Sequence, residues 1–128
     1  MGFFKRLKKS SSLREGFDFA KQGKYFEAID CFDKVLDHDI NHYDAWFNKG
    51  ITYMDLKETR SALECFDRAL KLEPKKSINW HAKGLVLIEL EKNQEALNCF
   101  NKALQLDPDF KSAKKAVENL RFSGKQKS

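Results

Sequence analysis

Apolar and small residues between positions 43 and 72 occur in two runs, and within each run they are mostly three, four or seven positions apart. Such spacing places side chains on one face of an α-helix. Residues 56–60 separate the runs and form a short polar turn. The pattern predicts two amphipathic helices, with Trp46, Gly50, Tyr53 and Met54 on the face of the first and Ala62, Phe66, Ala69 and Leu70 on that of the second.

This pattern returns with a period of 34 residues. Residues 64–74 are ECFDRALKLEP, and residues 98–108 are NCFNKALQLDP. Residues 43–76 and 77–110 align without a gap, and residues 9–42 join them more weakly in the same phase. A fixed period of this kind indicates an array of helical hairpins, each of which needs its neighbours to cover its apolar faces.

The ends of the helices have their own signals. Thr59 and Asn93 are predicted N-caps of second helices, and the LEP and LDP segments predict where those helices end, because proline disfavours helical geometry in the residue before it. Residues 111–122 continue the apolar phase with a polar outer face, which predicts a capping helix, followed by a tail over 123–128.

Glycine recurs inside the first helix of every repeat, at positions 16, 50 and 84, although it costs about 1 kcal/mol there relative to alanine. Close approach of the two helices explains the recurrence. We expect the alanines at 28, 62 and 96 to lie opposite, so that small residues face each other, with tryptophan and phenylalanine filling the space beside them.

These residues resemble the tetratricopeptide repeat (TPR) family. The second unit has Trp46-x2-Lys49-Gly50-x2-Tyr53 followed by Ala62-x3-Phe66, Ala69 and Pro74, and the third repeats most of it from Trp80 to Pro108. Lysine replaces the usual leucine before the glycine, and the first unit has Ser12 for the tryptophan and Ile40 for the proline. The resemblance implies an all-α, right-handed superhelical solenoid of three TPR helix-turn-helix repeats (9–42, 43–76, 77–110) plus a C-terminal capping helix.

The resemblance also implies a function. In this family the first helices of the repeats line a concave groove that binds peptides, so we expect a protein–protein interaction module, an adaptor or scaffold, that binds an apolar peptide or partner helix. The groove would also present Arg14, Lys21, Asp55, Ala82, Glu89, Lys115 and Asn119. The residues expected to contact the partner are Leu13, Phe17, Phe47, Asn48, Ile51, Met54, His81, Leu85 and Ile88.

Chaperone-binding members of the family hold a peptide carboxylate with two lysines, two asparagines and an arginine. The corresponding positions here are Leu13, Phe17, Asn48, Ile78 and Ala82, of which only Asn48 fits. We therefore expect no carboxylate clamp. Two alternatives remain for the apolar strip: it is filled by another copy or by the chain's own N-terminal segment, or it is ordinary core.

The net charge of +5 is unevenly distributed. Residues 1–9 have a charge of +4 and residues 111–128 of +5, whereas residues 10–110 are acidic, so a basic stripe for nucleic acid is not expected. The N-terminal extension, residues 1–8, contains Phe3, Phe4, Lys5 and Arg6. We favour its packing on the first repeat, or disorder, over contact with a membrane surface. Without an apolar run for a span or signal peptide, we expect a cytoplasmic protein.

No catalytic motif occurs in the sequence. Cys31, Cys65 and Cys99 fall once per repeat, which predicts reduced packing residues instead of a disulfide or zinc site. His38 and His42 lie four residues apart but on either side of a predicted helix end. We therefore expect no enzyme, no cofactor and no metal.

Overall fold

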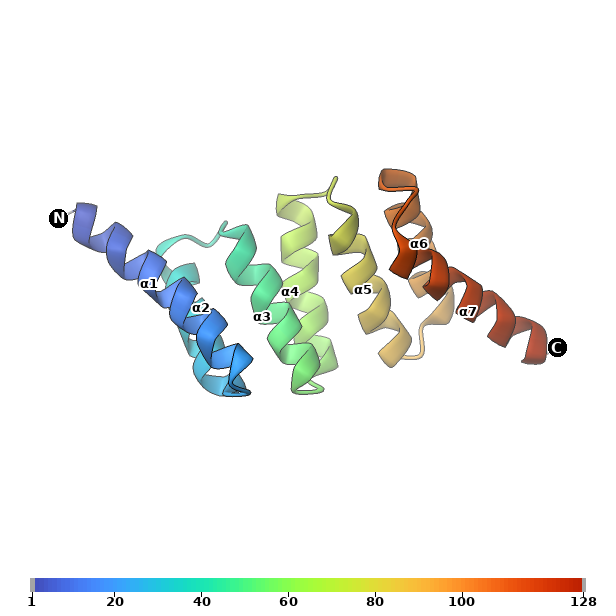
Figure 1. Cartoon of the computed structure of the whole chain (residues 1–128), viewed down its shortest axis with the longest axis horizontal. Helices are drawn as coiled ribbons and strands as arrows, with labels where there is room; N and C mark the ends of the chain where they lie inside the picture. Colours follow the sequence, from blue (N-terminus) through green and yellow to red (C-terminus); the bar gives the residue numbers. More distant parts are fainter. Residues whose placement is uncertain (1, 128) are drawn as a thin grey trace. The chain divides into compact units, whose positions relative to one another are not determined.

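The computed structural model describes residues 2–127, with the side chains of residues 11–123. Every regular element in that part of the chain is an α-helix (Figure 1). The chain divides into two compact units, residues 1–72 and 73–128. The predicted all-α helical repeat fold is confirmed.

The first unit consists of two helical hairpins. The helices of each hairpin pack on one another, and the second helix of the first hairpin packs on the first helix of the next. The second hairpin begins at Tyr43, where the second repeat is expected to begin. The four helices are α1 (Gly2–Lys21), α2 (Tyr25–His38), α3 (Tyr43–Asp55) and α4 (Thr59–Leu72).

The second unit contains one hairpin and a further helix. The helices are α5 (Ser77–Glu89), α6 (Asn93–Leu106) and α7 (Lys111–Lys127), and α6 packs against both of the others. α7 begins at the start of the predicted capping helix and continues past residue 122, so residues 123–127 are also helical. Ala113 and Val117 are its buried residues.

The predicted helix ends are correct, whereas the predicted N-caps are wrong by one residue. α4 and α6 stop at Leu72 and Leu106, two positions before a proline in each case. Asn93 is the first residue of α6, and the N-cap is Lys92, which makes no side-chain cap hydrogen bond. Thr59 likewise lies inside α4, whose first turn is closed by the Ala62 amide donating to the Glu58 carbonyl.

Each hairpin turn contains one residue in the left-handed region. Gly23 has φ 76°, and at the equivalent positions, 34 and 68 residues later, Lys57 has φ 63° and Glu91 has φ 61°. Glycine adopts this conformation without steric cost, whereas side chains with a Cβ do so rarely. The repeat geometry thus imposes the same turn on three different residues.

A phenylalanine from the second helix covers the glycine of the first helix in every hairpin. Phe32, Phe66 and Phe100 are at most 1% exposed. A Cβ built on Gly50 would lie 2.7 Å from Cε1 of Phe66, with similar distances at the other two glycines. The alanines at 28, 62 and 96 are fully buried, and the three atoms nearest to a Cβ built on each glycine belong to the ring. The glycine therefore makes room for the ring of the second helix.

Gly50→Ala should lower the free energy of unfolding by about 1 kcal/mol. An added methyl group in a filled site costs about 1–3 kcal/mol, which exceeds the gain of about 1 kcal/mol in helix propensity. Urea denaturation followed by circular dichroism measures the change. In the Phe66→Leu background the same substitution should cost less, because the ring atoms that it meets are gone. A Gly50→Ala protein as stable as the wild type would contradict this packing.

Candidate functional site

A cleft of about 200 Å³ opens between α1 and α3 in the first unit. The α1 residues that line it are spaced by three and four positions, and those of α3 by three, four and seven, so each set forms one helix face. Phe32 of α2 closes the floor between the two helices. The remaining lining residues are Phe17, Ala20 and Lys21 from α1 and Asn48, Ile51, Thr52 and Asp55 from α3.

The apolar part of this cleft rests on the core. The ring centroids of Phe17 and Phe32 lie 5.8 Å apart, and the rings are tilted by 57°, a separation within the range that aromatic pairs prefer. Phe32 is 1% exposed, Phe17 is half-buried, and Ile51 is 40% exposed at the rim. A ligand would therefore meet a rigid aromatic floor and an accessible aliphatic rim.

The polar part of the cleft is organised by α3. The Asn48 Nδ2 donates to the carbonyl oxygen of Asp44 at 2.8 Å, which fixes the side chain along the helix. The Thr52 hydroxyl donates to the Asn48 carbonyl oxygen at 2.8 Å and is thereby satisfied although Thr52 is 1% exposed. Lys21 and Asp55 place one charge of each sign in the last turns of α1 and α3.

Three of the nine predicted partner-binding residues, Phe17, Asn48 and Ile51, line this cleft. Leu13 instead packs against the core cluster of Val35, Leu36 and Ala45.

The other two predicted residues of the first unit lie partly in the hairpin packing. Phe47 is half-buried, with its ring 5.8 Å from Tyr43 and 5.6 Å from Phe66. Met54 is half-buried.

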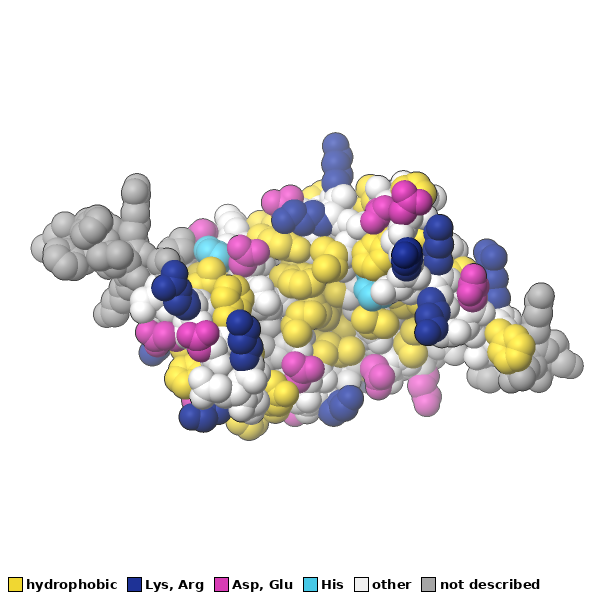
Figure 2. All heavy atoms as spheres, viewed as in Figure 1, with side chains coloured by type: hydrophobic (Ala, Val, Ile, Leu, Met, Phe, Trp, Pro, Cys, Tyr) yellow, Lys and Arg dark blue, Asp and Glu magenta, His cyan; other side chains and the backbone are white. Residues whose placement is uncertain are grey.

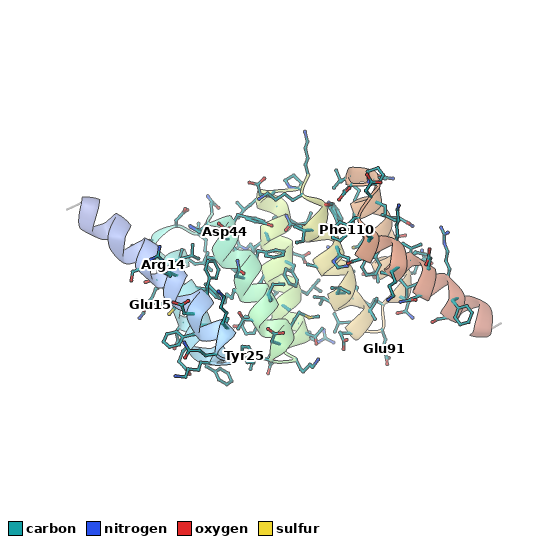
Figure 3. The ribbon with its side chains drawn as sticks, viewed as in Figure 1. Arg14, Glu15, Tyr25, Asp44, Glu91 and Phe110 are labelled. Atoms are coloured by element: carbon teal, nitrogen blue, oxygen red, sulfur yellow. The ribbon has the colours of Figure 1, made fainter. Side chains whose placement is uncertain are left out.

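In the space-filling view, hydrophobic side chains gather over α3 (Figure 2). Figure 3 shows Arg14 and Glu15 on α1 and Asp44 in the first turn of α3.

In the second unit, α5 has its own exposed apolar residues. Ile78 is 45% and Leu85 is 41% exposed, and their spacing of seven positions places them on one helix face. Ile88 is half-buried. Of the three predicted residues here, only Leu85 offers a large accessible apolar surface.

His81 is the third of these and is more enclosed than predicted. Its ring lies 5.6 Å from Phe100 of α6 and 4.8 Å from Phe110, which immediately precedes α7. Burial lowers the pKa of His81 below its usual value, because the charged form loses solvation between the two rings. The neutral imidazole thus contributes to the packing of α5, α6 and the start of α7.

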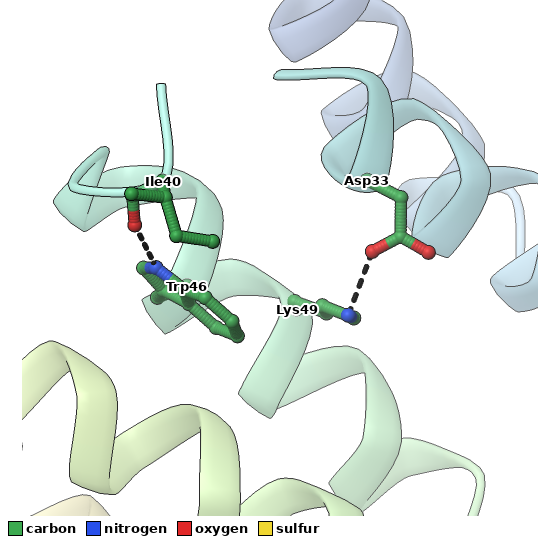
Figure 4. Close-up of polar contacts among 4 residues, drawn as sticks. All are labelled: Asp33, Ile40, Trp46 and Lys49. Atoms are coloured by element: carbon green, nitrogen blue, oxygen red, sulfur yellow. Dashed lines mark hydrogen bonds and ion pairs between the residues drawn. The ribbon is translucent and has the colours of Figure 1, made fainter. Parts of the chain in front are cut away.

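The lysine that replaces the usual leucine of the repeat forms a polar contact between hairpins. Lys49 Nζ lies 2.6 Å from Asp33 Oδ1, so that α3 is bound to α2 (Figure 4). Burial alone would lower the pKa of Lys49, but the hydrogen bond and charge of Asp33 outweigh it and raise the pKa. The sequence showed that Lys49 departs from the usual leucine, but it did not indicate that Asp33 would be its partner.

Trp46 forms a second cluster that the sequence did not predict. Lys49 Nζ and Arg68 Cζ lie 5.4 Å and 5.2 Å from its ring centroid, within cation–π range. Its Nε1 donates to the carbonyl oxygen of Ile40 at 2.6 Å (Figure 4). The adjacent cleft of about 350 Å³ is lined by Trp46, Glu64, Asp67, Arg68 and Lys71.

The three cysteines are buried thiols. Burial raises the pKa of the Cys65 thiol to about 11, so that it stays protonated at neutral pH and is a poor nucleophile. Among the described side chains, no three His, Cys, Asp or Glu residues come together in a way that could hold a metal ion. Within residues 2–127, no helix combines the length and apolar content that a membrane span requires.

The sequence model described as Tetratricopeptide repeat matches residues 43–76 and 80–110, just over half of the chain. The chain belongs to the tetratricopeptide repeat family. TPR domains are protein–protein interaction modules that bind peptides. A search of curated protein sequences found no match.

Solved TPR structures superpose on nearly the whole chain. The first TPR domain of Spaghetti (RPAP3), bound to the HSP90 peptide SRMEEVD, gives a TM-score of 0.86 at 26% identity over 91% of this chain and 93% of that one. The first TPR domain of human RPAP3 gives 0.84 at 26% identity over 94% and 96%. MamA gives 0.86 at 20% identity over 92% and 68%, which shows the fold alone.

His81 should make the stability of this TPR chain depend on pH. Because the folded-state pKa lies below the ordinary value of 6.5, protonation favours the unfolded state. The stabilisation is complete above about pH 6.5 and is lost as the pH falls below it. Urea denaturation between about pH 7.5 and about pH 5.5 should therefore show a smaller loss of stability for His81→Gln than for the wild type.

The matched control is His38→Gln, because His38 is exposed at the end of α2. That variant should retain the pH dependence of the wild type. Parallel pH profiles for His81→Gln and the wild type would contradict the assignment.

Proposed function

We propose that this TPR chain is an adaptor or scaffold module that binds an apolar peptide segment or partner helix on its first-helix face. The observation that supports the proposal is the cleft between α1 and α3, with its floor of Phe17 and Phe32 and the exposed rim residue Ile51. An apolar surface of this kind that is exposed to solvent is typical of an interaction site.

The size of the cleft favours one peptide side chain over a small-molecule ligand. Its volume of about 200 Å³ is below the range of about 300–1,000 Å³ that is usual for small-molecule pockets. An aliphatic or aromatic side chain of a bound peptide would contact the floor. The side-chain oxygen of Asn48 would accept a hydrogen bond from the peptide backbone, while its nitrogen remains on the Asp44 carbonyl.

We further propose that the groove is not a chaperone-tail carboxylate clamp, although the similar RPAP3 domain binds the peptide SRMEEVD. Leu13 packs against the core cluster, and Phe17 packs on Phe32. Both side chains are apolar, so neither position offers a cation to a carboxylate. Ile78 is an exposed aliphatic residue, and Ala82 is 5% exposed. An acidic peptide end would lose solvation at these positions without gaining a counter-charge.

Ile51→Glu should weaken the binding of an apolar peptide by tenfold or more, because the peptide would bury a carboxylate at the rim of the cleft. Peptides selected from a random display library against the wild type provide the ligands, and isothermal titration calorimetry measures their affinity. Ile51 is preferable to Phe47 for this test, because Phe47 packs on Phe66 and its substitution would disturb the fold.

The matched control is Phe26→Glu, since Phe26 is 69% exposed on α2 and does not line the cleft. This variant should bind like the wild type. Two results would contradict the proposal: selection mainly of peptides with acidic C-terminal ends, or binding of SRMEEVD as tight as that of the apolar peptides.

Light scattering on the free protein tests the alternative that a second copy fills the groove, which predicts a mass that rises with concentration.

A further inference from the structure

The positive charge of the second unit is concentrated on α7. This helix contains six basic residues and one acidic residue, Glu118, whereas residues 73–110 contain five basic and six acidic residues. Figure 2 shows lysine and arginine side chains gathered over α7. The rest of the unit is therefore close to neutral, and the charge that a partner would meet is that of one helix.

The exposed face of α7 carries Lys111, Lys114, Lys115, Arg121 and Phe122, with Lys111 and Lys115 on either side of Phe122 and with Lys114 and Arg121 about 80° and 100° from it on one flank. Ala113 is fully buried and Val117 is 6% exposed, so the opposite face meets solvent. Successive residues of an α-helix are about 100° apart, which places residue 122 diametrically opposite residue 113 and within about 20° of residues 111 and 115. Phe122 is 62% exposed, so its ring is accessible beside these lysines.

We propose that this face, formed by Lys111, Lys114, Lys115, Arg121 and Phe122, docks the protein on an anionic lipid surface. Lysine and arginine side chains would lie at the level of the headgroups, with their aliphatic stems along the boundary. The Phe122 ring would enter the interface between headgroups and acyl chains, where aromatic side chains partition favourably. Complementary charge and one apolar contact thus point to the same partner.

The composition of the face favours lipid over nucleic acid. Three of its four basic residues are lysines, which act as point charges, whereas recognition of phosphates and bases in nucleic acid favours the planar fork of arginine. Binding of single strands uses several stacked aromatic residues along a groove, but this face has one phenylalanine on a convex helix. A flat anionic surface needs neither a groove nor a row of rings.

The expected affinity is modest and depends on salt. Each basic residue near an anionic bilayer increases partitioning about fivefold, and screening shortens the range of this attraction at high ionic strength. Removing two of the lysines should therefore reduce partitioning by tenfold or more. Glu118 lies on the same face and reduces the attraction, so Glu118→Gln should increase it.

The experiment is co-sedimentation of the full chain with vesicles of phosphatidylcholine alone and with vesicles that also contain phosphatidylserine. The wild type should bind only the second kind, and less as salt is added. Lys111→Gln/Lys115→Gln and Phe122→Ser should each lose most of this binding with unchanged circular dichroism, whereas Glu118→Gln should gain. Lys57→Gln/Lys75→Gln is the charge-matched control, because both lysines are exposed outside α7.

Four results would overturn the proposal. The first is equal sedimentation with both kinds of vesicle. The second is an equal loss for the α7 and control pairs, which would show an effect of net charge alone. The third is tighter binding to single-stranded oligonucleotide or polyglutamate than to the anionic vesicles. Lys5→Gln/Arg6→Gln measures any contribution from the N-terminal segment, and a loss confined to this variant would also reject the assignment to α7.

The surface is independent of the peptide cleft. Ile51→Glu should leave vesicle binding unchanged, and the α7 variants should leave peptide affinity unchanged, so that failure of either proposal is recognisable without the other.

Discussion

The contact between a phenylalanine ring and a helix glycine determines how closely the two helices of each hairpin approach. Phe66 occupies the space that a side chain at Gly50 would need, and the first and third hairpins repeat this contact with Phe32 and Phe100. The phenylalanine of the second helix thereby fills the space between the two helices. The face of the first helix that points away from the second helix is not covered by this ring. Phe17 and Ile51, which line the cleft, each lie one position after a glycine that is covered by a ring.

The two proposed surfaces use opposite physical principles. The cleft between α1 and α3 has an apolar floor and rim, and its charged residues, Lys21 and Asp55, lie at helix ends. The outer face of α7 is charged, and its apolar content is the single residue Phe122. Desolvation of a matching side chain would determine affinity in the cleft, whereas long-range attraction would determine affinity on α7. Salt should therefore separate the two interactions.

The sequence predicted the fold well because the period of 34 residues fixes the helix order, and the apolar phase fixes which face of each helix is buried. It predicted the site less well. Periodicity places Leu13, Phe47 and His81 at equivalent positions, and Phe47 and His81 do share one repeat contact, with Phe66 and Phe100. Their other neighbours differ: Leu13 packs against the core cluster, Phe47 lies beside Tyr43, and His81 lies beside Phe110. How deeply each side chain is buried depends on those tertiary neighbours, which the spacing of residues in the sequence does not specify. The N-caps failed for a related reason, because the repeat turn, and not the residue type, determines where α4 and α6 begin.

Each hairpin contains one buried cysteine whose labelling rate can measure local unfolding of that hairpin. One thiol lies beneath the surface of each hairpin, at Cys31, Cys65 and Cys99, and each is at most 6% exposed. A thiol in such a position reacts with a labelling reagent only when its surroundings open, so its modification rate follows local unfolding and not the average behaviour of the chain. The three rates together would show whether the array opens from one end or as a whole.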